Sequence, residues 1–512
     1  MRTNKIKFIS ILTSNRKDHC IFVRYNESGN KFCDLLLPMA ERLIHDHLSE
    51  GKRFPLSSGV SVRKSCFLKK EGYMLSKKRL FAVSVSLVLL GTACSGTNGQ
   101  SSPQPAQTKA AGKEPVELVL YSTAATSDEE VKQKLSDPIE KKFPNVKIKY
   151  IKKGNGTNIN ELIAAGQTID LYFESVNFFN TVTTYQLAYD MTELIKKHGI
   201  DLSAFENTMI DYARSMSNNG IYGLPVWTEN VILFYNKDLF DKFGVAYPKN
   251  GMTWDELTEL ARKMTRNDGG KQYMGFAASP SHMLRANQYA LTMLDPKTDK
   301  AIINTEPKWK QLFQTYFMNT SDDTGYRNVM TSVLKNKLPY KDPILKDQSL
   351  AMLAYLSQLD WAASGPGGMN WDIAALPTFK ELPNVGSSAY PFYWGVTAQS
   401  KYKDEGAEVI KFLTSKEYQT SQARSGTMTT LRDDAVKKQL AQDSKHKDKN
   451  ISAIFYNQYA PMPKKSAFEG DAQKSYEDAV HEAALGSADI NTLFRKIEDG
   501  ANKAVDEAKV KK

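Results

Sequence analysis

Hydrophobic and polar positions follow two alternating patterns in the middle of the chain. Short apolar runs at 116–121, 146–151 and 169–173 have the length and composition of buried strands. Between them, segments 128–142 and 159–165 place apolar residues three and four positions apart, which is the spacing of an amphipathic helix. Strands that alternate with helices at this spacing predict a mostly parallel α/β sheet.

A helix start is readable at Thr253. Thr253 and Glu256 have the spacing of a capping box, in which each side chain accepts a hydrogen bond from the other residue's backbone N–H. Trp254 begins an apolar face that continues to Met264, so we assign this tryptophan to packing rather than to ligand binding. Two further helices are predicted at 407–413 and 490–508.

The 512 residues are 41% hydrophobic and 24% charged, which fits two or three packed domains and is too polar for a multi-span membrane protein. The net charge of +11 would favour nucleic acid as a partner. However, residues 1–93 contain 17 basic and 7 acidic residues, whereas the rest of the chain has 51 and 50. The basic character therefore belongs to the N-terminal segment, and we expect no nucleic-acid partner.

A processing signal precedes Cys94. Met74 is followed by three basic residues, then by the apolar run 80–90 and the small residues 91–93. This run is too short to span a bilayer but suits a signal peptide at 74–93. The pattern resembles a bacterial lipoprotein signal, which implies that Cys94 is lipidated and anchors the protein by two acyl chains.

The segments on either side of this signal are predicted to lie outside the folded body. Residues 94–114 are rich in Ser, Gly, Pro and Gln, as in a flexible tether. Residues 1–73 show no extended hydrophobic period, and we interpret them as an upstream extension that is not normally translated. A genuine cytoplasmic extension is the alternative interpretation.

Signatures of catalysis and metal binding are missing from the sequence. No phosphate-binding loop, nucleophile elbow or dinucleotide fingerprint occurs, and His481 begins a metalloprotease-like motif that lacks its second histidine. The cysteines other than Cys94 all precede it, at Cys20, Cys33 and Cys66, so the mature chain has no thiol pair. We therefore expect no metal and no cofactor. Paired carboxylates far apart in sequence leave a carbohydrate-active enzyme open.

Three motifs appear in a specific order: Leu-Pro at 224–225, Tyr-Asn-Lys-Asp-Leu-Phe at 235–240 and Thr-Trp-Asp-Glu-Leu at 253–257. This order resembles the extracellular solute-binding proteins of ABC importers, family 1. Further similarity occurs at 349–352, 376–380 and 466–468, so the resemblance covers essentially all of 116–512.

The resemblance implies an α/β, two-lobed, periplasmic-binding-protein-like fold with a hinge between the lobes. Lobe I would comprise 115–228, with about 395–455 returning to it, and lobe II would comprise 229–394, with about 456–512 returning to it. A ligand that contacts both lobes only in the closed state shifts the population toward closure. The implied protein is a monomer that performs no covalent chemistry. It binds a carbohydrate outside the bacterial cell membrane and docks on ABC permease subunits.

Comparison with the maltose-binding members suggests ligand-binding positions. Glu229 lies six residues before Tyr235, where those relatives have a sugar-binding glutamate at the lobe crossover. Aromatic or acidic ligand contacts of the relatives fall on other residue types here, which implies a ligand other than maltose. The full set of candidates is Glu229, Trp227, Glu174, Asn177, Trp361, Tyr393, Trp394 and Glu469. A glycine at 395 would permit close backbone approach.

Each of these candidates also has a purely structural interpretation. The tryptophans could fill the core, and the polar residues could be ordinary solvated surface. Two alternative functions also remain open at this point. One is a surface-anchored carbohydrate-active enzyme, and the other is the same fold binding a peptide, a polyamine or a phosphate ester.

Overall fold

The computed structural model describes residues 114–511, apart from 125–126, 319–322, 335–337 and 365–367. The chain divides into two units, 1–104 and 105–512, and the described residues all belong to the second. The predicted upstream extension, the signal peptide, Cys94 and the tether as far as residue 113 lie outside the described residues. Within the described part of the chain, no helix has the length and apolar character needed to cross a membrane.

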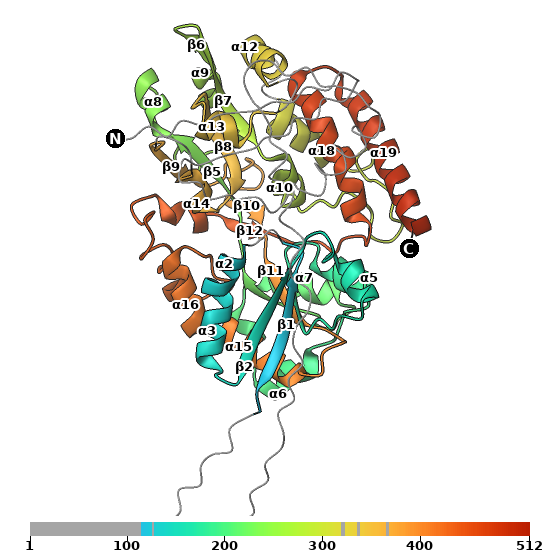
Figure 1. The fold of residues 1–512 in the computed structure, drawn as a ribbon. Coiled ribbons are helices and arrows are strands. Elements are labelled where there is room, and N and C mark those ends of the chain that lie inside the picture. The colour runs from blue at the N-terminus through green and yellow to red at the C-terminus, as the bar shows by residue number, and fades with distance from the viewer. Residues whose placement is uncertain (1–113, 125–126, 319–322, 335–337, 365–367, 512) are drawn as a thin grey trace, which may run out of the picture. The chain divides into compact units, whose positions relative to one another are not determined.

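The first of two five-stranded sheets has the strand order β2-β1-β3-β11-β4 (Figure 1). Its strands are β1 (Val116–Ser122), β2 (Val146–Lys152), β3 (Leu171–Glu174), β4 (Leu224–Trp227) and β11 (Phe392–Val396). β1 pairs in parallel with β2 and with β3, as the strand-helix alternation predicts. β11 arrives from much later in the sequence and lies antiparallel between β3 and β4.

Helices cover this sheet on both sides. The predicted helix at 128–142 is present as one continuous stretch in which a π-helical turn separates two α-helical parts. The predicted helix at 407–413 begins earlier than expected. The helical elements around the first sheet are α2 (Asp128–Val131), η2 (Lys132–Ser136), α3 (Asp137–Lys142), α4 (Ile159–Ala164), α5 (Phe178–Thr184), α6 (Thr192–His198), η3 (Leu202–Ala204), α7 (Asn207–Met216), α15 (Lys403–Leu413), α16 (Lys416–Ser425) and α17 (Asp434–Lys437).

The second five-stranded sheet has the order β6-β7-β8-β5-β9. Its strands are β5 (Val231–Asn236), β6 (Arg266–Asp268), β7 (Lys271–Ala278), β8 (Leu350–Leu356) and β9 (Trp371–Ala374). β7 and β8 are parallel, whereas β5 is antiparallel to both β8 and β9. The sheet is therefore mixed. Every residue of β8 is buried, which explains its unbroken apolar sequence.

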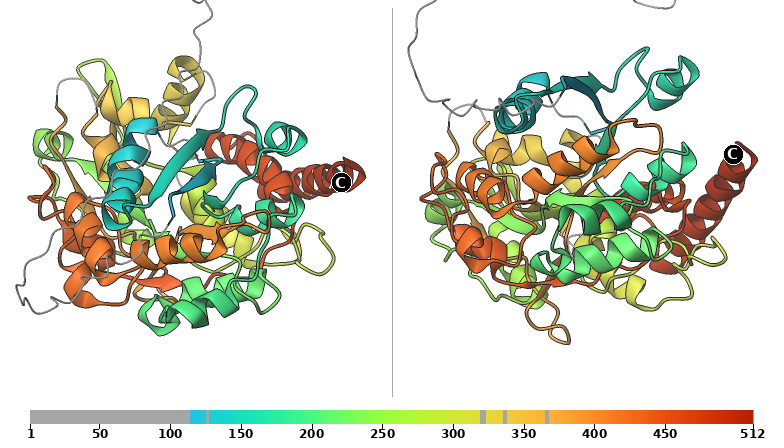
Figure 2. Two further views of the ribbon diagram at one scale, coloured as in Figure 1. Left: turned by 60° about the horizontal axis from the view of Figure 1, so that its bottom comes forward. Right: turned by 90° about the horizontal axis from the view of Figure 1, so that it is seen from below.

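The helical elements associated with the second sheet are α8 (Lys237–Phe243), α9 (Trp254–Met264), α10 (Pro280–Arg285), α11 (Lys308–Phe313), η4 (Gln314–Met318), α12 (Thr324–Asn328), η5 (Val329–Val333), α13 (Lys341–Leu345), α14 (Leu359–Ala362), α18 (Glu469–Leu485) and α19 (Ile490–Lys511). Figure 2 shows the C-terminal pair, α18 and α19, lying side by side. Residues of both helices join the core around this sheet.

Helix α9 confirms the capping box. Thr253 Oγ1 accepts from the backbone N–H of Glu256, and Glu256 Oε2 accepts from the backbone N–H of Thr253. Trp254 is buried and donates its indole N–H to Gln288, as expected for a packing residue. The helix lies so close to β7 that a Cβ at Gly275 would come within 2.0 Å of the Ala261 carbonyl oxygen.

Two hydrophobic cores, one around each sheet, define two lobes, and several chain segments connect them. The segment between β4 and β5 contains Glu229, and the segment before β11 contains Tyr390. These two residues exchange backbone hydrogen bonds, from Glu229 N to Tyr390 O and from Tyr390 N to Glu229 O. A third segment joins at Met428, whose carbonyl accepts from Thr228 N. The two-lobed α/β fold with a hinge is thus confirmed.

The short strands β10 (Val385–Ser388) and β12 (Gln458–Ala460) form a parallel two-stranded sheet of their own. One further helical turn, η6 (Ile451–Phe455), precedes β12.

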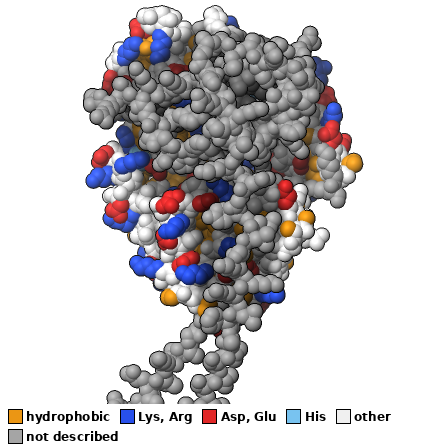
Figure 3. All heavy atoms as spheres, in the orientation of Figure 1, with side chains coloured by type: hydrophobic (Ala, Val, Ile, Leu, Met, Phe, Trp, Pro, Cys, Tyr) orange, Lys and Arg blue, Asp and Glu red, His pale blue; other side chains and the backbone are white. Residues whose placement is uncertain are grey.

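On the face drawn in Figure 3, basic and acidic side chains are interspersed over the described surface. Several oppositely charged side chains of the described residues form ion pairs, such as Lys147 with Glu140 at 2.7 Å. The visible described surface therefore carries no stripe of one charge that would suit a nucleic acid.

Candidate ligand cleft

A cavity of about 590 Å³ lies where the crossing segments meet. This volume is in the range of clefts that bind small molecules. Both lobes and the crossing segments contribute to its walls. The residues used below are Glu130, Lys134, Trp227 and Phe392 on the side of the first sheet, Glu229 on a crossing segment, and Lys341, Gln358, Asp360 and Trp361 on the side of the second sheet.

Glu229 is the central acidic group of this cavity. It follows β4, and its backbone bonds to Tyr390 fix its position on the hinge. Its two carboxylate oxygens accept hydrogen bonds from the Gln358 amide, at 2.8 and 3.0 Å. Burial raises the pKa of Glu229 to about 7, and the bonds from Gln358 work in the opposite direction. The group is therefore poised to exchange between its charged and neutral forms near neutral pH.

Trp227 forms an aromatic wall on the other side of the hinge. It is the last residue of β4 and is half-buried. Its ring stacks on Phe392, with the ring centroids 4.8 Å apart and an interplanar angle of 21°. The ring also meets Phe173 edge-on, with a centroid distance of 5.6 Å. Because these neighbours fix the ring, Trp227 presents a rigid apolar surface to the cavity.

Trp361 lines the cavity from the second lobe. It lies on α14, directly after the strand β8, and is half-buried. Its ring packs against Phe234, with centroids 4.9 Å apart, and against Tyr355, with centroids 5.1 Å apart. Trp227, Glu229 and Trp361, three of the residues predicted from the sequence, thus line one cavity.

Tyr393 and Trp394 are placed differently from the expectation, because both are fully buried in the core of the first lobe. β11 is an interior strand of its sheet and is covered on both faces at Tyr393 and Trp394, so that only Phe392, its first residue, reaches the cavity. Tyr393 donates to the Met209 carbonyl, and Trp394 stacks on Phe173 with centroids 4.7 Å apart. The close approach expected at Gly395 is present, because a Cβ there would lie 2.3 Å from the Tyr222 carbonyl oxygen.

Glu469 also lies away from the cavity. It is the first residue of α18 and is buried. Its carboxylate accepts hydrogen bonds from the backbone N–H groups of Met293 at 2.7 Å and Leu294 at 3.3 Å. Burial raises the pKa of this carboxyl group. The structure therefore gives Glu469 a role in holding a loop of the second lobe, which differs from the predicted contact with a ligand.

Glu174 is the last residue of β3 and Asn177 follows the strand; both are half-buried. The Glu174 carboxylate accepts from the hydroxyl groups of Tyr172 and Thr181. Asn177 precedes α5, and its side-chain oxygen lies 3.9 Å from where a Cβ at Gly470 would be. Neither residue lines the cavity described above. Their relation to the cavity is indirect: β3 and β4, the strand that ends at Trp227, both pair with β11.

Sequence reasoning missed several residues of the cavity wall. Gln358 is the second residue after the buried strand β8, and a polar residue near a strand end is the available signal. Lys341 begins the short helix α13, and nothing in its local sequence distinguishes it from the chain's other lysines. Asp360 also lies on the wall and accepts from His446 at 3.0 Å. In the part of the chain that the structure describes, no three His, Cys, Asp or Glu side chains are grouped to hold a metal ion.

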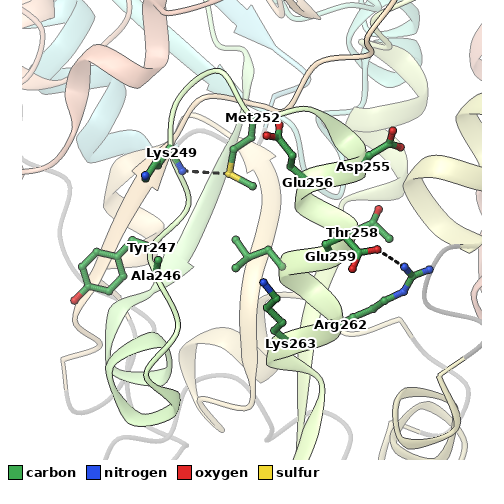
Figure 4. A pocket seen from close by; sticks show the side chains of 11 residues that line it. Ala246, Tyr247, Lys249, Met252, Asp255, Glu256, Thr258, Glu259, Arg262 and Lys263 are labelled. Carbon is green, nitrogen blue, oxygen red and sulfur yellow. Dashed lines mark hydrogen bonds and ion pairs between the residues drawn. The ribbon is translucent and has the colours of Figure 1, made fainter.

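A second hollow, also of about 590 Å³, lies between the segment 246–252 and helix α9 (Figure 4). Its charged side chains are largely engaged already. Glu259 pairs with Arg262, as the dashed line in Figure 4 marks, and Asp255 pairs with Lys380 at 2.6 Å. All of its lining residues come from one lobe, so hinge closure does not enclose it. We therefore place the candidate site at the cavity between the lobes.

Comparisons with known proteins agree with this geometry. The family described as "Bacterial extracellular solute-binding protein" matches residues 122–420. An uncharacterized ABC transporter extracellular-binding protein of Pyrococcus horikoshii is 28% identical over 212 residues, which are 38% of this chain. The match spans 44% of that relative, less than half of its length.

Solved structures share the fold across most of this chain. An ABC substrate-binding protein from Listeria monocytogenes in complex with cycloalternan is 20% identical, with a TM-score of 0.60, and covers 77% of this chain and 99% of its own. A sugar transporter from Rhizobium etli in an open conformation is 19% identical, with a TM-score of 0.57, and covers 76% and 99%. The sugar-binding protein MalE from Xanthomonas citri is 15% identical, with a TM-score of 0.59, and covers 77% and 98%. Together with the family match and the two lobes around a cleft, these likenesses lead to one conclusion: the chain belongs to the bacterial extracellular solute-binding proteins.

Proposed function

We propose that this protein is the substrate-binding subunit of an ABC importer and that it captures an oligosaccharide or a sugar derivative between its lobes. The observation that carries the proposal is the cavity at the hinge. An aromatic ring from each lobe, Trp227 and Trp361, and the acidic Glu229 line the same space. The family match and the sugar-binding proteins among the structural relatives support this choice of ligand.

The chemistry of these side chains suits a sugar. The C–H faces of a pyranose ring pack well on aromatic rings, whereas its hydroxyl groups need hydrogen-bond acceptors and donors. Trp227 and Trp361 offer the rings, Glu229 offers two acceptor oxygens, and Gln358 offers an amide. Such a ligand would bridge both lobes only when they close, so binding would favour the closed state.

The remaining parts of the proposal rest on the sequence. The protein would act as a monomer on the outer face of the bacterial membrane, held by the lipid on Cys94, and would deliver its ligand to permease subunits unchanged. The division into lobe I (115–228 and about 395–455) and lobe II (229–394 and about 456–512) belongs to the proposal as well. Glu174 and Asn177 remain predicted contacts for a ligand that extends along β3.

A melting experiment with the protein lacking residues 1–94 tests this function. A panel of oligosaccharides is added, and we expect at least one to raise the melting temperature and to be recovered intact by chromatography. Product formation would instead favour a carbohydrate-active enzyme. A response to a peptide, a polyamine or a phosphate ester, with none to any sugar, would change the ligand class.

A further inference from the structure

Some of the charged side chains on the cavity wall form ion pairs, and others do not. The wall carries five of them: Glu130, Lys134, Glu229, Lys341 and Asp360. Lys134 pairs with Glu130 at 2.9 Å. Two side chains outside the wall contact Asp360: His446 by a hydrogen bond of 3.0 Å and Lys445 as an ion pair at 3.5 Å. Two charged side chains of the wall remain without an ion pair to any described residue: the cationic Lys341 and the acidic Glu229.

The acidic side chain, Glu229, already has its hydrogen-bond partner in Gln358. Its pKa of about 7 means that a sizeable fraction is neutral near neutral pH. Lys341 acts on Glu229 through space and lowers its pKa, as expected for two groups on the same cavity. Among the described residues, Lys341 itself has no carboxylate within ion-pair distance. The wall therefore offers a positive charge that no acidic group of the described chain neutralises directly.

Aromatic rings hold Lys341 in place. Its Nζ lies 4.5 Å from the centroid of the Tyr355 ring and 5.6 Å from that of Trp361. A third ring, that of Tyr340, lies 5.9 Å away. Cation–π contacts of this kind fix an ammonium group without neutralising its charge. The group consequently keeps its capacity to bind an anion, and it is positioned before any ligand arrives.

Lys341, Tyr355, Trp361 and His282 lie together and are called the corner below. Its polar groups other than Lys341 add no negative charge. The indole N–H of Trp361 has no hydrogen-bond partner in the described part of the chain, and it is a donor. His282, whose ring meets that of Tyr355, has its pKa lowered to about 4 by burial and by the nearby Arg285 and Lys341. The imidazole is therefore neutral near pH 7. Arg285 donates to Gln473 and does not line the cavity, so Lys341 is the cation that the corner presents to the cavity, and the corner contains no acceptor with negative charge.

We propose that Lys341 forms a subsite for the carboxylate of an acidic saccharide, so that the ligand class is an oligosaccharide containing a uronic acid. This inference rests on the proposed function and narrows it. A carboxylate is favoured over a phosphate ester because the cavity wall formed by the described residues holds a single cation without an ion pair, which matches one negative charge and leaves the second charge of a phosphate dianion without a partner. In the bound state, the sugar ring lies against Trp361 and its carboxylate meets the Lys341 ammonium group.

The test uses full-length protein and matched pairs of ligands. The probes are α-1,4-digalacturonate, a mannuronate disaccharide and a glucuronyl-xylose disaccharide, each with its carboxyl-reduced neutral form, together with trehalose 6-phosphate. Affinities are measured by calorimetry for the unchanged protein, for Lys341→Met and for Lys346→Met. Methionine keeps an unbranched stem over the rings. Lys346 is an exposed lysine directly after the same helix, and it pairs with Asp342. Melting temperatures of the three proteins check that each is folded.

We expect at least one uronate to bind the unchanged protein ten or more times as tightly as its neutral form. Lys341→Met should reduce this ratio to below three, whereas Lys346→Met should leave it unchanged. Equal affinity for acidic and neutral forms, or an equal loss of both in Lys341→Met, overturns the subsite and leaves sugar binding intact. Tightest binding of the phosphate ester overturns the choice of carboxylate. Failure of every saccharide to bind overturns the proposed function together with the subsite.

Discussion

The side-chain amide of Gln358 donates to both carboxylate oxygens of Glu229, at 2.8 and 3.0 Å. This contact joins the end of the central strand of one lobe to the segment that crosses between the lobes. It holds the carboxylate in a fixed orientation before a ligand is present, which lowers the ordering cost of binding. A sugar hydroxyl that reaches Glu229 must share this carboxylate with the amide or displace it.

The stability of the protein should depend on pH through Glu229. Its pKa is about 7 in the folded protein and 4.5 in its ordinary state, so folding favours the neutral form. The contribution of Glu229 is therefore fully present below pH 4.5 and is lost as the pH rises through 7. Glu229→Gln mimics the neutral form. Its free energy of unfolding relative to the unchanged protein should rise by about 2 to 3 kcal/mol between pH 4.5 and 8.

Urea unfolding of both proteins at pH 4.5, 6 and 8 measures this difference. Glu259→Gln is the matched control, because Glu259 is an exposed carboxylate on α9 and its replacement should leave the pH dependence unchanged. Parallel stability profiles for Glu229→Gln and the unchanged protein would show that the carboxyl group titrates alike in the folded and unfolded states.

Trp227→Ala should weaken ligand binding at least tenfold, because it removes the aromatic wall on the side of the first lobe. The free energy of unfolding should fall by only about 1 to 2 kcal/mol, since the ring is half-buried and stacks mainly on Phe392. Calorimetry with the best saccharide of the panel gives the affinity, and chemical unfolding gives the stability. Unchanged affinity would remove Trp227 from the binding site.

Trp394→Ala should have the opposite effect, with a large loss of stability and no loss of ligand affinity. This ring is fully buried and stacks on Phe173, so its removal should cost about 3 to 5 kcal/mol of unfolding free energy. The variant that remains folded should retain its ligand affinity, because the ring does not line the cavity. A selective loss of affinity at normal stability would return Trp394 to the set of ligand contacts.

Glu469→Ala should destabilise the second lobe without changing the ligand affinity of the folded protein. Two backbone N–H groups, of Met293 and Leu294, would lose their acceptor, at a cost of about 1 to 3 kcal/mol. Glu469→Gln keeps one acceptor oxygen and should recover part of this stability. Thermal unfolding together with calorimetry checks the prediction, which a large loss of affinity at full stability would contradict.

Gly275→Ala should destabilise the packing of α9 on β7. The new Cβ would lie 2.0 Å from the Ala261 carbonyl oxygen, so helix and strand must move apart. We expect a cost of about 1 to 3 kcal/mol, which is typical of overpacking. Gly154→Ala is the control, because its Cβ would make an ordinary contact of 3.4 Å with Thr157. Equal urea midpoints for the two variants would contradict the prediction.

The sequence predicts local structure well where a single physical cause dominates. Thr253 and Glu256 form their capping box because both partners lie within one helical turn. Strand β1 occupies the predicted region because its residues are nearly all buried. By contrast, the antiparallel strand β11 pairs with β3 across more than 200 positions of sequence, and no local pattern encodes such a partner.

The same distinction applies to the cavity. Glu229, Trp227 and Trp361 were predicted from their place in family motifs, and they line one space. Tyr393 and Trp394 carry the same aromatic chemistry, yet an interior strand covered on both faces turns them into core residues. The roles of Lys341 and Gln358 depend on their neighbours in the folded protein, which composition and spacing do not predict.

The position of β11 has a consequence for biosynthesis. The first sheet contains β1, β3 and β4 from before residue 228, but the strand that joins β3 to β4 is Phe392–Val396. While the chain is being synthesised from its N-terminus, that sheet cannot be completed until more than 160 further residues have been added. The strands β5 to β9 can pair in the meantime, so the second sheet is able to form before the first sheet is complete.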